Sequence, residues 1–441
     1  AIIGTGPAGM FAAMELIEKH PALKIVMIER GPIRDADDRS NLTCGWGGSG
    51  AFSDGKLNWT SITGGHLLSE VLGEEKFNEL VKYVDGRYLE FGGESNLIEA
   101  RGQEVEDLKS RAFSGGLDLV PFPIRHLGTD RCYRIVENIR RYLQEKGITF
   151  IFSNGVEEIN KIGDNFILTL ENNERVDAKR VIAAVGRPGA DWLVKEAKRL
   201  GLKFQNSGVD VGFRIEVRAK TLEHITKHLY EAKIFYESPT FRDRVRTFCM
   251  CPYGFVGKEN YRGLTTVNGH SYADNKSENT NFAVLVTQFF TDPFDNPISY
   301  GKYVAEAANR LSGGGVLIQR LGDLKDGRRS TQNKIDRGFI NPTLKEAVPG
   351  DLSLSMYHRQ TVDILEMLEA LESVAPGIAS DHTLLYGNEV KFYSVKIETG
   401  SGFETSIPGL YVAGDGSGYT RGLLQASMQG VVVAKYLVDS V

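Results

Sequence analysis

The chain has 441 residues, of which 41% are hydrophobic and 25% are charged, the balance of an ordinary globular protein. At this length we expect two interleaved domains, each large enough to bury a core of its own. The formal net charge is -5 and no long basic run occurs, which argues against nucleic acid as a partner.

The start of the chain predicts a βαβ unit. Residues 1–3 have the character of a buried parallel strand end, a glycine-rich turn follows at 4–9, and an apolar helix extends to about residue 20. A second strand at 24–28 ends in Glu29. Because only three apolar residues precede the first glycine, we expect further strand residues upstream of Ala1.

This unit is typical of dinucleotide binding. Gly4 allows a tight turn, Gly6 lets the backbone approach a pyrophosphate, and Gly9 lets the helix pack closely on the strand. The helix N-terminus faces the phosphates with its positive end, and Glu29 suits a ribose hydroxyl pair. The alternative is an ordinary glycine-rich turn. The cofactor-binding candidates here are Gly4, Gly6, Pro7, Ala8, Gly9, Glu29 and Arg30.

A second glycine-rich segment, at residues 44–50, favours FAD over NAD. Its successive backbone amides suit a pyrophosphate and the edge of a flavin, although a flexible loop is the alternative. Lys56 follows this segment and is placed to hydrogen-bond near the flavin N5, or else is a solvated lysine. The candidates in the segment are Gly47, Gly48, Ser49 and Gly50.

The end of the chain predicts the segment that closes the cofactor site. A short buried strand at 409–413 leads into Gly414 and Asp415, and a last helix begins near Gly422 and Leu423. The Asp415 carboxylate suits the ribityl hydroxyls, and the helix N-terminus favours the negative charge of a reduced flavin.

Between these ends we expect an α/β fold with a Rossmann-like FAD-binding domain, discontinuous in sequence, and an inserted β-rich α+β substrate domain. The FAD-binding domain is assigned to residues 1–206, with a peripheral helical segment at about 66–124, and to the closing segment 382–441. Residues 207–381 form the substrate domain. The peripheral helices are expected to cover the flavin edge or the surface.

Catalytic candidates are less sharply defined. Asn268 and His270 lie at a predicted strand end and form a substrate-facing polar pair or an ordinary turn. Arg421, just before the last helix, is a candidate for the active-site wall, with Lys56 as the remaining candidate. Cys249 and Cys251 face one side of a regular strand, a poor disulfide geometry, so core packing is preferred over a redox pair.

Several motifs resemble the glutathione-reductase superfamily and, more narrowly, a broad group of uncharacterised FAD-dependent dehydrogenases. They are the 4–9 turn with Glu29, residues 52–57, 181–186, 211–216, 246–252 and 267–271, and the stretch 411–416. The resemblance covers nearly the whole chain. It implies that the backbone of Val156 meets the adenine edge and that Gly186 also lies at the cofactor.

These observations predict an oxidoreductase that moves hydride between a small organic substrate and FAD. No second glycine fingerprint marks an NAD(P)H domain, so NAD(P)H enters only as a transient donor at the flavin face, or another protein supplies the electrons. A flavin monooxygenase and a non-catalytic flavin redox or RNA-modification factor are the alternatives. A homodimer or a redox partner is left open, and no metal is expected.

The cysteines and hydropathy indicate the compartment. Four scattered cysteines are too few for a disulfide framework, which favours a reducing setting. No apolar run approaches the roughly 20 residues of a membrane-spanning helix, and the N-terminus lacks the features of a targeting peptide. We therefore expect a cytoplasmic protein with no membrane partner.

Overall fold

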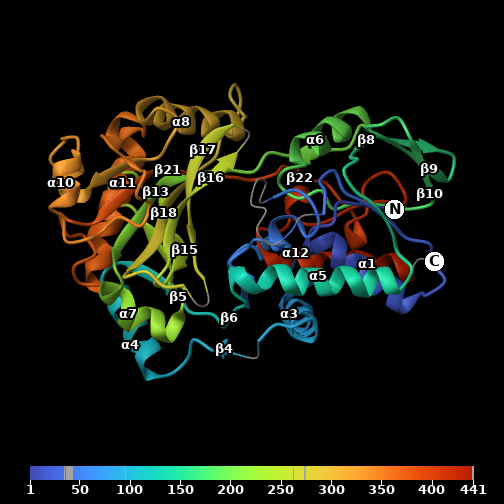
Figure 1. The fold of residues 1–441 in the computed structure, drawn as a ribbon, viewed down its shortest axis with the longest axis horizontal. Coiled ribbons are helices and arrows are strands. Elements are labelled where there is room, and N and C mark those ends of the chain that lie inside the picture. The colour runs from blue at the N-terminus through green and yellow to red at the C-terminus, as the bar shows by residue number, and fades with distance from the viewer. Residues whose placement is uncertain (34, 36–42, 95, 262, 273–274, 440–441) are drawn as a thin grey trace. The chain divides into compact units, whose positions relative to one another are not determined.

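The computed structural model describes residues 1–33, 35, 43–94, 96–261, 263–272 and 275–439, which fold into two units (Figure 1). Unit 1 comprises Ala1–Asn96, Arg125–Ser207 and Tyr393–Val441, and unit 2 comprises Leu97–Ile124 and Gly208–Phe392.

A parallel sheet in the strand order β23-β11-β1-β2-β7 organises unit 1. Its strands are β1 (Ile2–Ile3), β2 (Val26–Ile28), β7 (Thr149–Ile151), β11 (Val181–Ala183) and β23 (Leu410–Val412). Alternate residues of β1 enter different cores. Ile2 packs with side chains of helices α1 (Pro7–Lys19) and α12 (Leu423–Asp439), and Ile3 packs with the strands β8 (Val156–Ile162), β9 (Asn165–Leu170) and β10 (Arg175–Ala178). Burial on both faces explains why these short strands are apolar throughout.

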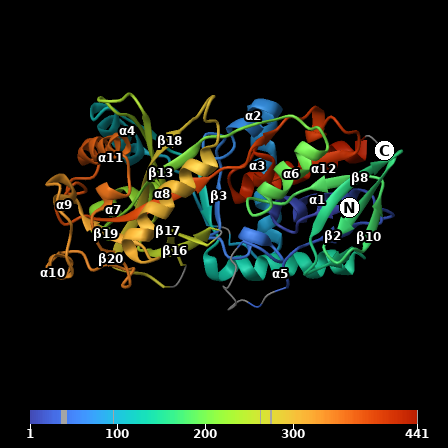
Figure 2. The same ribbon diagram turned by 90° about the horizontal axis from the view of Figure 1, so that it is seen from above.

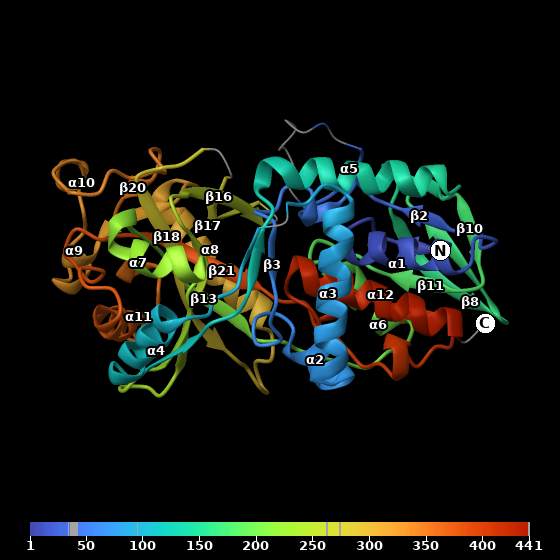
Figure 3. The same cartoon turned by 90° about the horizontal axis from the view of Figure 1, so that it is seen from below.

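Helices α1 (Pro7–Lys19) and α12 (Leu423–Asp439) pack side by side in unit 1 (Figure 1). Helix α3 (Glu74–Glu90) crosses α12 (Figure 3). The remaining elements of unit 1 are α2 (His66–Leu72), α5 (Thr129–Glu145), α6 (Ala190–Arg199), β3 (Lys56–Asn58), β8 (Val156–Ile162), β9 (Asn165–Leu170), β10 (Arg175–Ala178), β12 (Phe204–Gln205), β22 (Lys396–Ile397), η1 (Gly48–Gly50), η4 (Ser401–Phe403) and η5 (Asp415–Ser417).

A larger mixed sheet, in the order β20-β19-β21-β13-β18-β15-β14-β5, organises unit 2. Its strands are β5 (Leu117–Val120), β13 (Val209–Arg218), β14 (Lys233–Glu237), β15 (Arg244–Cys251), β18 (Asn279–Gln288), β19 (Leu317–Arg320), β20 (Val348–Pro349) and β21 (Leu384–Phe392). The other elements are α4 (Gln103–Ser114), α7 (Ala219–Leu229), α8 (Pro297–Ser312), α9 (Leu321–Lys325), α10 (Gln332–Asp336), α11 (His358–Ala370), η2 (Leu352–Leu354), η3 (Leu371–Ser373) and the hairpin β16 (Phe255–Tyr261) and β17 (Leu264–His270). Short strands β4 (Leu97–Ile98) and β6 (Ile124–His126) complete the described chain.

The two faces of β13 differ in chemistry. Val209, Val211 and Phe213 enter the core that α8 and α11 cover, and α8 lies against β13 and β21 (Figure 2). Asp210 and Arg214 alternate with them and are buried on the opposite face. Unit 2 therefore carries an apolar face under helices and a buried polar face.

The α/β class with a parallel, sequence-discontinuous sheet is confirmed. The expected domain limits need correction at two places. Residues 97–124 belong to unit 2 rather than to the FAD-binding domain, because β5 pairs with β14, Leu119 lying opposite Ile234. Unit 2 also ends at Phe392 rather than at residue 381, because β21 stays paired with β13 up to that residue.

Within the described residues, none of the helices combines the length and the apolar character that a membrane span requires.

Candidate functional site

The candidate cofactor site lies at the carboxyl edge of the parallel sheet in unit 1. Strands β1, β2, β11 and β23 are neighbours in parallel register, so the residues that follow them emerge at the same edge. Gly4, Glu29, Gly186 and Gly414 follow these strands. Ligands of open parallel sheets bind at this edge.

The first turn is shaped by the packing of its glycines. Gly4 has a φ of +99°, and a Cβ on it would lie 2.4 Å from the carbonyl oxygen of Ala184. A Cβ on Gly9 would lie 2.1 Å from the Gly4 oxygen, so both positions exclude any side chain. At Gly6, by contrast, no described atom lies within 4 Å of the Cβ position. Gly6 thus faces open space at the start of α1, as close approach of a pyrophosphate requires.

The start of α1 is suited to an anion. Gly6 is its N-cap, no side chain in the described part of the chain caps it, Pro7 occupies the first turn, and that turn contains no acidic residue. The backbone N–H groups and the positive end of the helix dipole are therefore left to an external anion such as a phosphate.

The second glycine-rich segment lies on this turn. The Gly47 N–H donates to the Thr5 carbonyl oxygen at 3.1 Å. A Cβ on Gly48 would lie 3.3 Å from the Gly6 Cα, and one on Gly50 would lie 2.9 Å from the Pro7 ring. Ser49 lies between them in η1. The segment has a defined structure rather than that of a free loop, and it borders the open space at Gly6.

Glu29 holds the two glycine-rich segments together. Its Oε2 accepts hydrogen bonds from the Thr5 N–H at 3.1 Å and the Thr5 hydroxyl at 2.9 Å. Its Oε1 accepts from the N–H groups of Gly31 and Gly45, both at 3.0 Å. A carboxylate offers about four lone-pair sites, so these donors already fill it. The predicted ribose contact must share the carboxylate with these donors or displace one of them.

Arg30 follows Glu29 after β2, and the segment that leads into Val156 reaches Glu29, because the Asn154 N–H donates to the Glu29 carbonyl oxygen at 3.3 Å. The Arg30 guanidinium pairs with Glu171 at 2.7 Å, and Glu171 also accepts from the Gly155 N–H at 3.1 Å. Val156, the first residue of β8, is buried. The structure therefore places the predicted adenine-contacting segment next to the residue predicted to contact the ribose.

The closing segment reaches the first turn from β23. Gly414 has a φ of +74°, and a Cβ on it would lie 2.9 Å from that of Ala8. A Cβ on Gly416 would lie 2.7 Å from the carbonyl oxygen of Gly186, so the predicted Gly186 also belongs to this edge. Helix α12 begins at Leu423, whose side chain borders Gly50.

Asp415 follows Gly414 in this closing segment and has polar neighbours. Its Oδ1 accepts a hydrogen bond from the Thr420 hydroxyl at 2.8 Å. Burial raises the pKa of the Asp415 carboxyl, and Arg187 and Thr420 only partly oppose that effect. A hydrogen-bonding partner such as a polyol hydroxyl would suit this desolvated carboxyl.

Sequence reasoning missed two residues of this edge. The Thr5 backbone and hydroxyl position Glu29, and Gln429 on α12 accepts from the Gly414 N–H at 2.8 Å. The buried Nε2 of Gln429 has no hydrogen-bond partner among the described residues. Thr5 lies inside the predicted turn and could have been found there, whereas nothing in the helical pattern distinguishes Gln429 from its neighbours.

Two catalytic candidates, Lys56 and Arg421, lie in unit 1. The Lys56 ammonium pairs with Asp54 at 3.0 Å and is almost wholly buried, which rules out the solvated-surface interpretation. Burial alone would raise the pKa of Asp54, but Lys56 and His126 outweigh it and lower that pKa. The Arg421 guanidinium stacks 3.7 Å from the centre of the Tyr393 ring.

The other two candidates, Asn268 and His270, lie on β17 in unit 2. Asn268 Oδ1 accepts from Arg214 at 3.1 Å, and Arg214 pairs with Glu389 through two nitrogen–oxygen contacts of 2.8 and 2.9 Å. Arg214 and Glu389 are fully buried on the polar face of the sheet. Asn268 is thus oriented by a buried ion pair, and the proposed role of both residues toward a substrate stays a prediction.

Lys233 adds a second buried cation to unit 2. Its ammonium donates to the Thr247 carbonyl oxygen at 3.2 Å and lies 3.4 Å from Glu231. Burial lowers the pKa of Lys233 to about 8, against the smaller opposing effect of Glu231. A lysine in this range can exchange a proton near neutral pH.

The edge of unit 1 fits FAD. It offers an uncapped helix N-terminus, open space at Gly6, a glycine-rich segment bordering that space, and an unpaired buried amide on Gln429 among the described residues. These features match a dinucleotide with a pyrophosphate and many hydroxyl groups.

A comparison with protein families also supports FAD as the cofactor. Residues 209–391 match a family model described as "FAD-dependent protein, C-terminal domain-like". This match indicates FAD as the cofactor. An uncharacterized protein of Clostridium beijerinckii is 25% identical over 481 residues, covering 99% of this chain and 80% of that protein.

Solved structures of two oxidases and of a flavoprotein/dehydrogenase are only distantly similar. Glycine oxidase from Geobacillus kaustophilus is 14% identical with a TM-score of 0.40, covering 100% of this chain and 94% of that one. NikD, an amino acid oxidase of nikkomycin biosynthesis, is 14% identical with a TM-score of 0.42, covering 100% and 93%. A flavoprotein/dehydrogenase from Cytophaga hutchinsonii is 10% identical with a TM-score of 0.42, covering 100% and 77%. Likenesses of this size do not identify an activity.

Proposed function

We propose that the chain is an FAD-dependent oxidoreductase that transfers hydride between a small organic substrate and the flavin. The observation that supports this most strongly is the open space at Gly6, which the glycine-rich segment and the start of α1 border at the carboxyl edge of a parallel sheet. When bound, FAD supplies the redox chemistry.

In this proposal, the residues of the chain bind and orient the cofactor and the substrate. The N–H groups at the start of α1 hold the pyrophosphate, Glu29 fixes the glycine-rich segments around it, and Asp415 meets the ribityl hydroxyls. Within unit 2, Asn268, which Arg214 orients, and His270 are the polar groups proposed to face a small substrate. A nicotinamide nucleotide acts as transient donor.

An anaerobic absorbance titration of the purified protein with NADH and NADPH tests the proposal, after the cofactor released on denaturation has been identified by mass. We expect FAD in the protein and bleaching of the oxidised flavin band by one nucleotide. Slow reoxidation on readmission of air would disfavour a monooxygenase.

If neither nucleotide bleaches the band, the transient nicotinamide donor is wrong, and the reductant must be the substrate or another protein. A protein that neither contains nor takes up FAD would contradict the proposed function itself.

A further inference from the structure

A pair of cysteines on β15 of unit 2 departs from regular strand geometry. The register between β15 and β18 shifts between Phe248 and Cys251, so the strand bulges there. Cys249 within the bulge has a φ of +46°, a conformation that a residue with a side chain rarely adopts. The sequence analysis treated Cys249 and Cys251 as residues of a regular strand. The bulge shows that this assumption was wrong.

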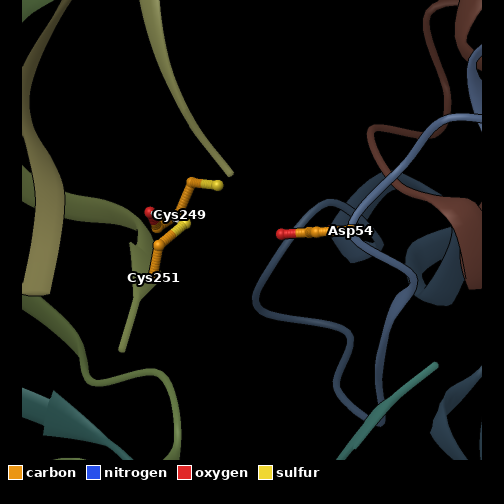
Figure 4. Close-up of side chains that lie close together, drawn as sticks. All are labelled: Asp54, Cys249 and Cys251. Atoms are coloured by element: carbon orange, nitrogen blue, oxygen red, sulfur yellow. Dashed lines mark hydrogen bonds between the residues drawn. The ribbon is translucent and has the colours of Figure 1, made fainter. Parts of the chain in front are cut away.

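The bulge brings the two sulfur atoms together (Figure 4). They lie within 4.8 Å of each other, and the Cys251 sulfur lies 3.5 Å from the Cys249 carbonyl oxygen. Neither cysteine forms a disulfide here. The sulfurs would have to approach to about 2.05 Å to form a bond, and the bulge removes the regular strand geometry on which the objection to a disulfide rested.

A buried cation, Arg214, lies next to the pair. The Arg214 guanidinium donates to the Cys249 carbonyl oxygen at 2.8 Å. A Cβ on Gly269 would lie 2.7 Å from that guanidinium and 3.0 Å from the Cys251 sulfur, so the guanidinium and this sulfur are neighbours. Burial would lower the pKa of Arg214, but Glu389, Cys249 and Cys251 together raise it. By the same interaction, the cation stabilises negative charge on the sulfurs.

Exposure distinguishes the two cysteines. Cys249 is partly exposed, whereas Cys251 is fully buried. This is the arrangement of an attacking thiol that a small molecule can reach and a resolving thiol held behind it.

We propose that Cys249 and Cys251 form a thiol–disulfide exchange site that a low-molecular-weight disulfide oxidises. The Cys249 thiolate attacks one sulfur of the small disulfide, forming a mixed disulfide and releasing one thiolate. The Cys251 thiolate then attacks the Cys249 sulfur, closing the internal disulfide and releasing the second thiolate. The protein dithiol loses two electrons, the small disulfide gains them, and the two cysteine protons neutralise the released thiolates.

The test uses the full chain in buffers of graded ratios of oxidised to reduced glutathione. After acid quenching, denaturation, alkylation and trypsin digestion, peptide 247–258 carries both cysteines and no other, because cleavage follows Arg246 and Lys258. We expect a form of this peptide that is unalkylated and two hydrogens lighter than the dithiol, increasing with the ratio. A peptide that carries two alkyl groups at every ratio would overturn the proposal.

Single variants separate the two roles. Cys251→Ser should trap glutathione on Cys249, and Cys249→Ser should leave Cys251 unmodified in the folded protein. Cys44→Ser and Cys132→Ser are matched controls that should retain the internal disulfide. Equal glutathione adducts on the Cys249→Ser and Cys251→Ser variants would contradict the assigned order of attack and with it the proposed site.

Discussion

Gly430 on α12 lies against the backbone of Ala8 on α1, so closely that a Cβ on Gly430 would fall 2.1 Å from the Ala8 carbonyl oxygen. The contact sets how near α12 approaches the helix that begins at the dinucleotide turn. Because the obstacle is backbone rather than a flexible side chain, the helices must separate to admit a methyl group.

We predict that Gly430→Ala destabilises unit 1 by about 1–3 kcal/mol, the usual cost of overpacking. Denaturant unfolding followed by tryptophan fluorescence measures this, because Trp46, Trp59 and Trp192 all lie in unit 1. Gly86→Ala in α3 is the control, since no described atom lies within 4 Å of its Cβ position. It should raise stability by about 0.5–1 kcal/mol. Equal effects of the two variants would refute the packing argument.

The second prediction concerns Gly6, where a substitution should affect cofactor binding but not folding. Gly6 has a φ of -71° and a ψ of -176°, which valine tolerates, and no described atom contacts its Cβ position. Gly6→Val should therefore unfold at the same denaturant concentration as the flavin-free wild type. Its FAD affinity should fall at least tenfold, about 1.4 kcal/mol, because the side chain occupies the pyrophosphate space. Flavin absorbance per chain gives the readout, and a fully yellow variant would refute the placement.

The third prediction concerns a buried ion pair in unit 1 and the cost of removing one of its partners. Arg125 contacts Asp85 through its Nε and Nη2 atoms, both at 2.8 Å, and both side chains are buried. Asp85→Ala leaves an uncompensated cation and should cost about 3–5 kcal/mol. Glu90→Gln removes a partner of Arg87 that is largely exposed, and should cost at most about 1 kcal/mol. Comparable losses in the same fluorescence assay would show that burial does not set the cost.

Local patterns were sufficient to predict the three glycine-rich turns that meet at one edge of the parallel sheet. The turn at Gly4, the glycine-rich segment and the strand before Gly414 each depend on neighbours in sequence, and all three meet at one sheet edge. The hydrogen bonds that Glu29 makes to these turns were harder to predict from the sequence. The Gly45 N–H that donates to the Glu29 carboxylate lies sixteen positions further along the chain. Hydrophobic periodicity identifies an element but not its tertiary partner.

The wrong or missed predictions concern contacts between residues that lie far apart in the sequence. Residues 117–120 alternate like any strand, and nothing local shows that they pair with β14, more than a hundred residues later. The bulge at Cys249 depends on how β15 meets β18, so sequence alternation could not reveal it. Gln429 likewise becomes distinctive only once Gly414 is placed beside it.

The last prediction concerns Asp363 on α11. Its carboxylate accepts from the Ser238 hydroxyl at 2.5 Å, and burial, followed by the neighbouring Asp243, raises its pKa to about 6. An unfolded aspartate titrates near pH 4, so between about pH 4 and pH 6 the folded chain binds more protons than the unfolded chain. The contribution of Asp363 to stability is therefore largest below this window and is lost as pH rises through it.

Asp363→Asn keeps an acceptor for Ser238 but removes the titration. The stability of the wild type relative to this variant should therefore fall from pH 4 to pH 6 and change little above pH 7, as measured by hydrogen exchange of peptides from α11. The matched control is Glu369→Gln, because Glu369 lies on the same helix and its side chain is largely exposed. This control removes an exposed charge from the same helix and so separates the loss of a charge from the loss of the buried carboxyl. A stability difference for Asp363→Asn that stays constant from pH 4 to pH 7 would mean that this carboxyl titrates alike in the folded and unfolded chains.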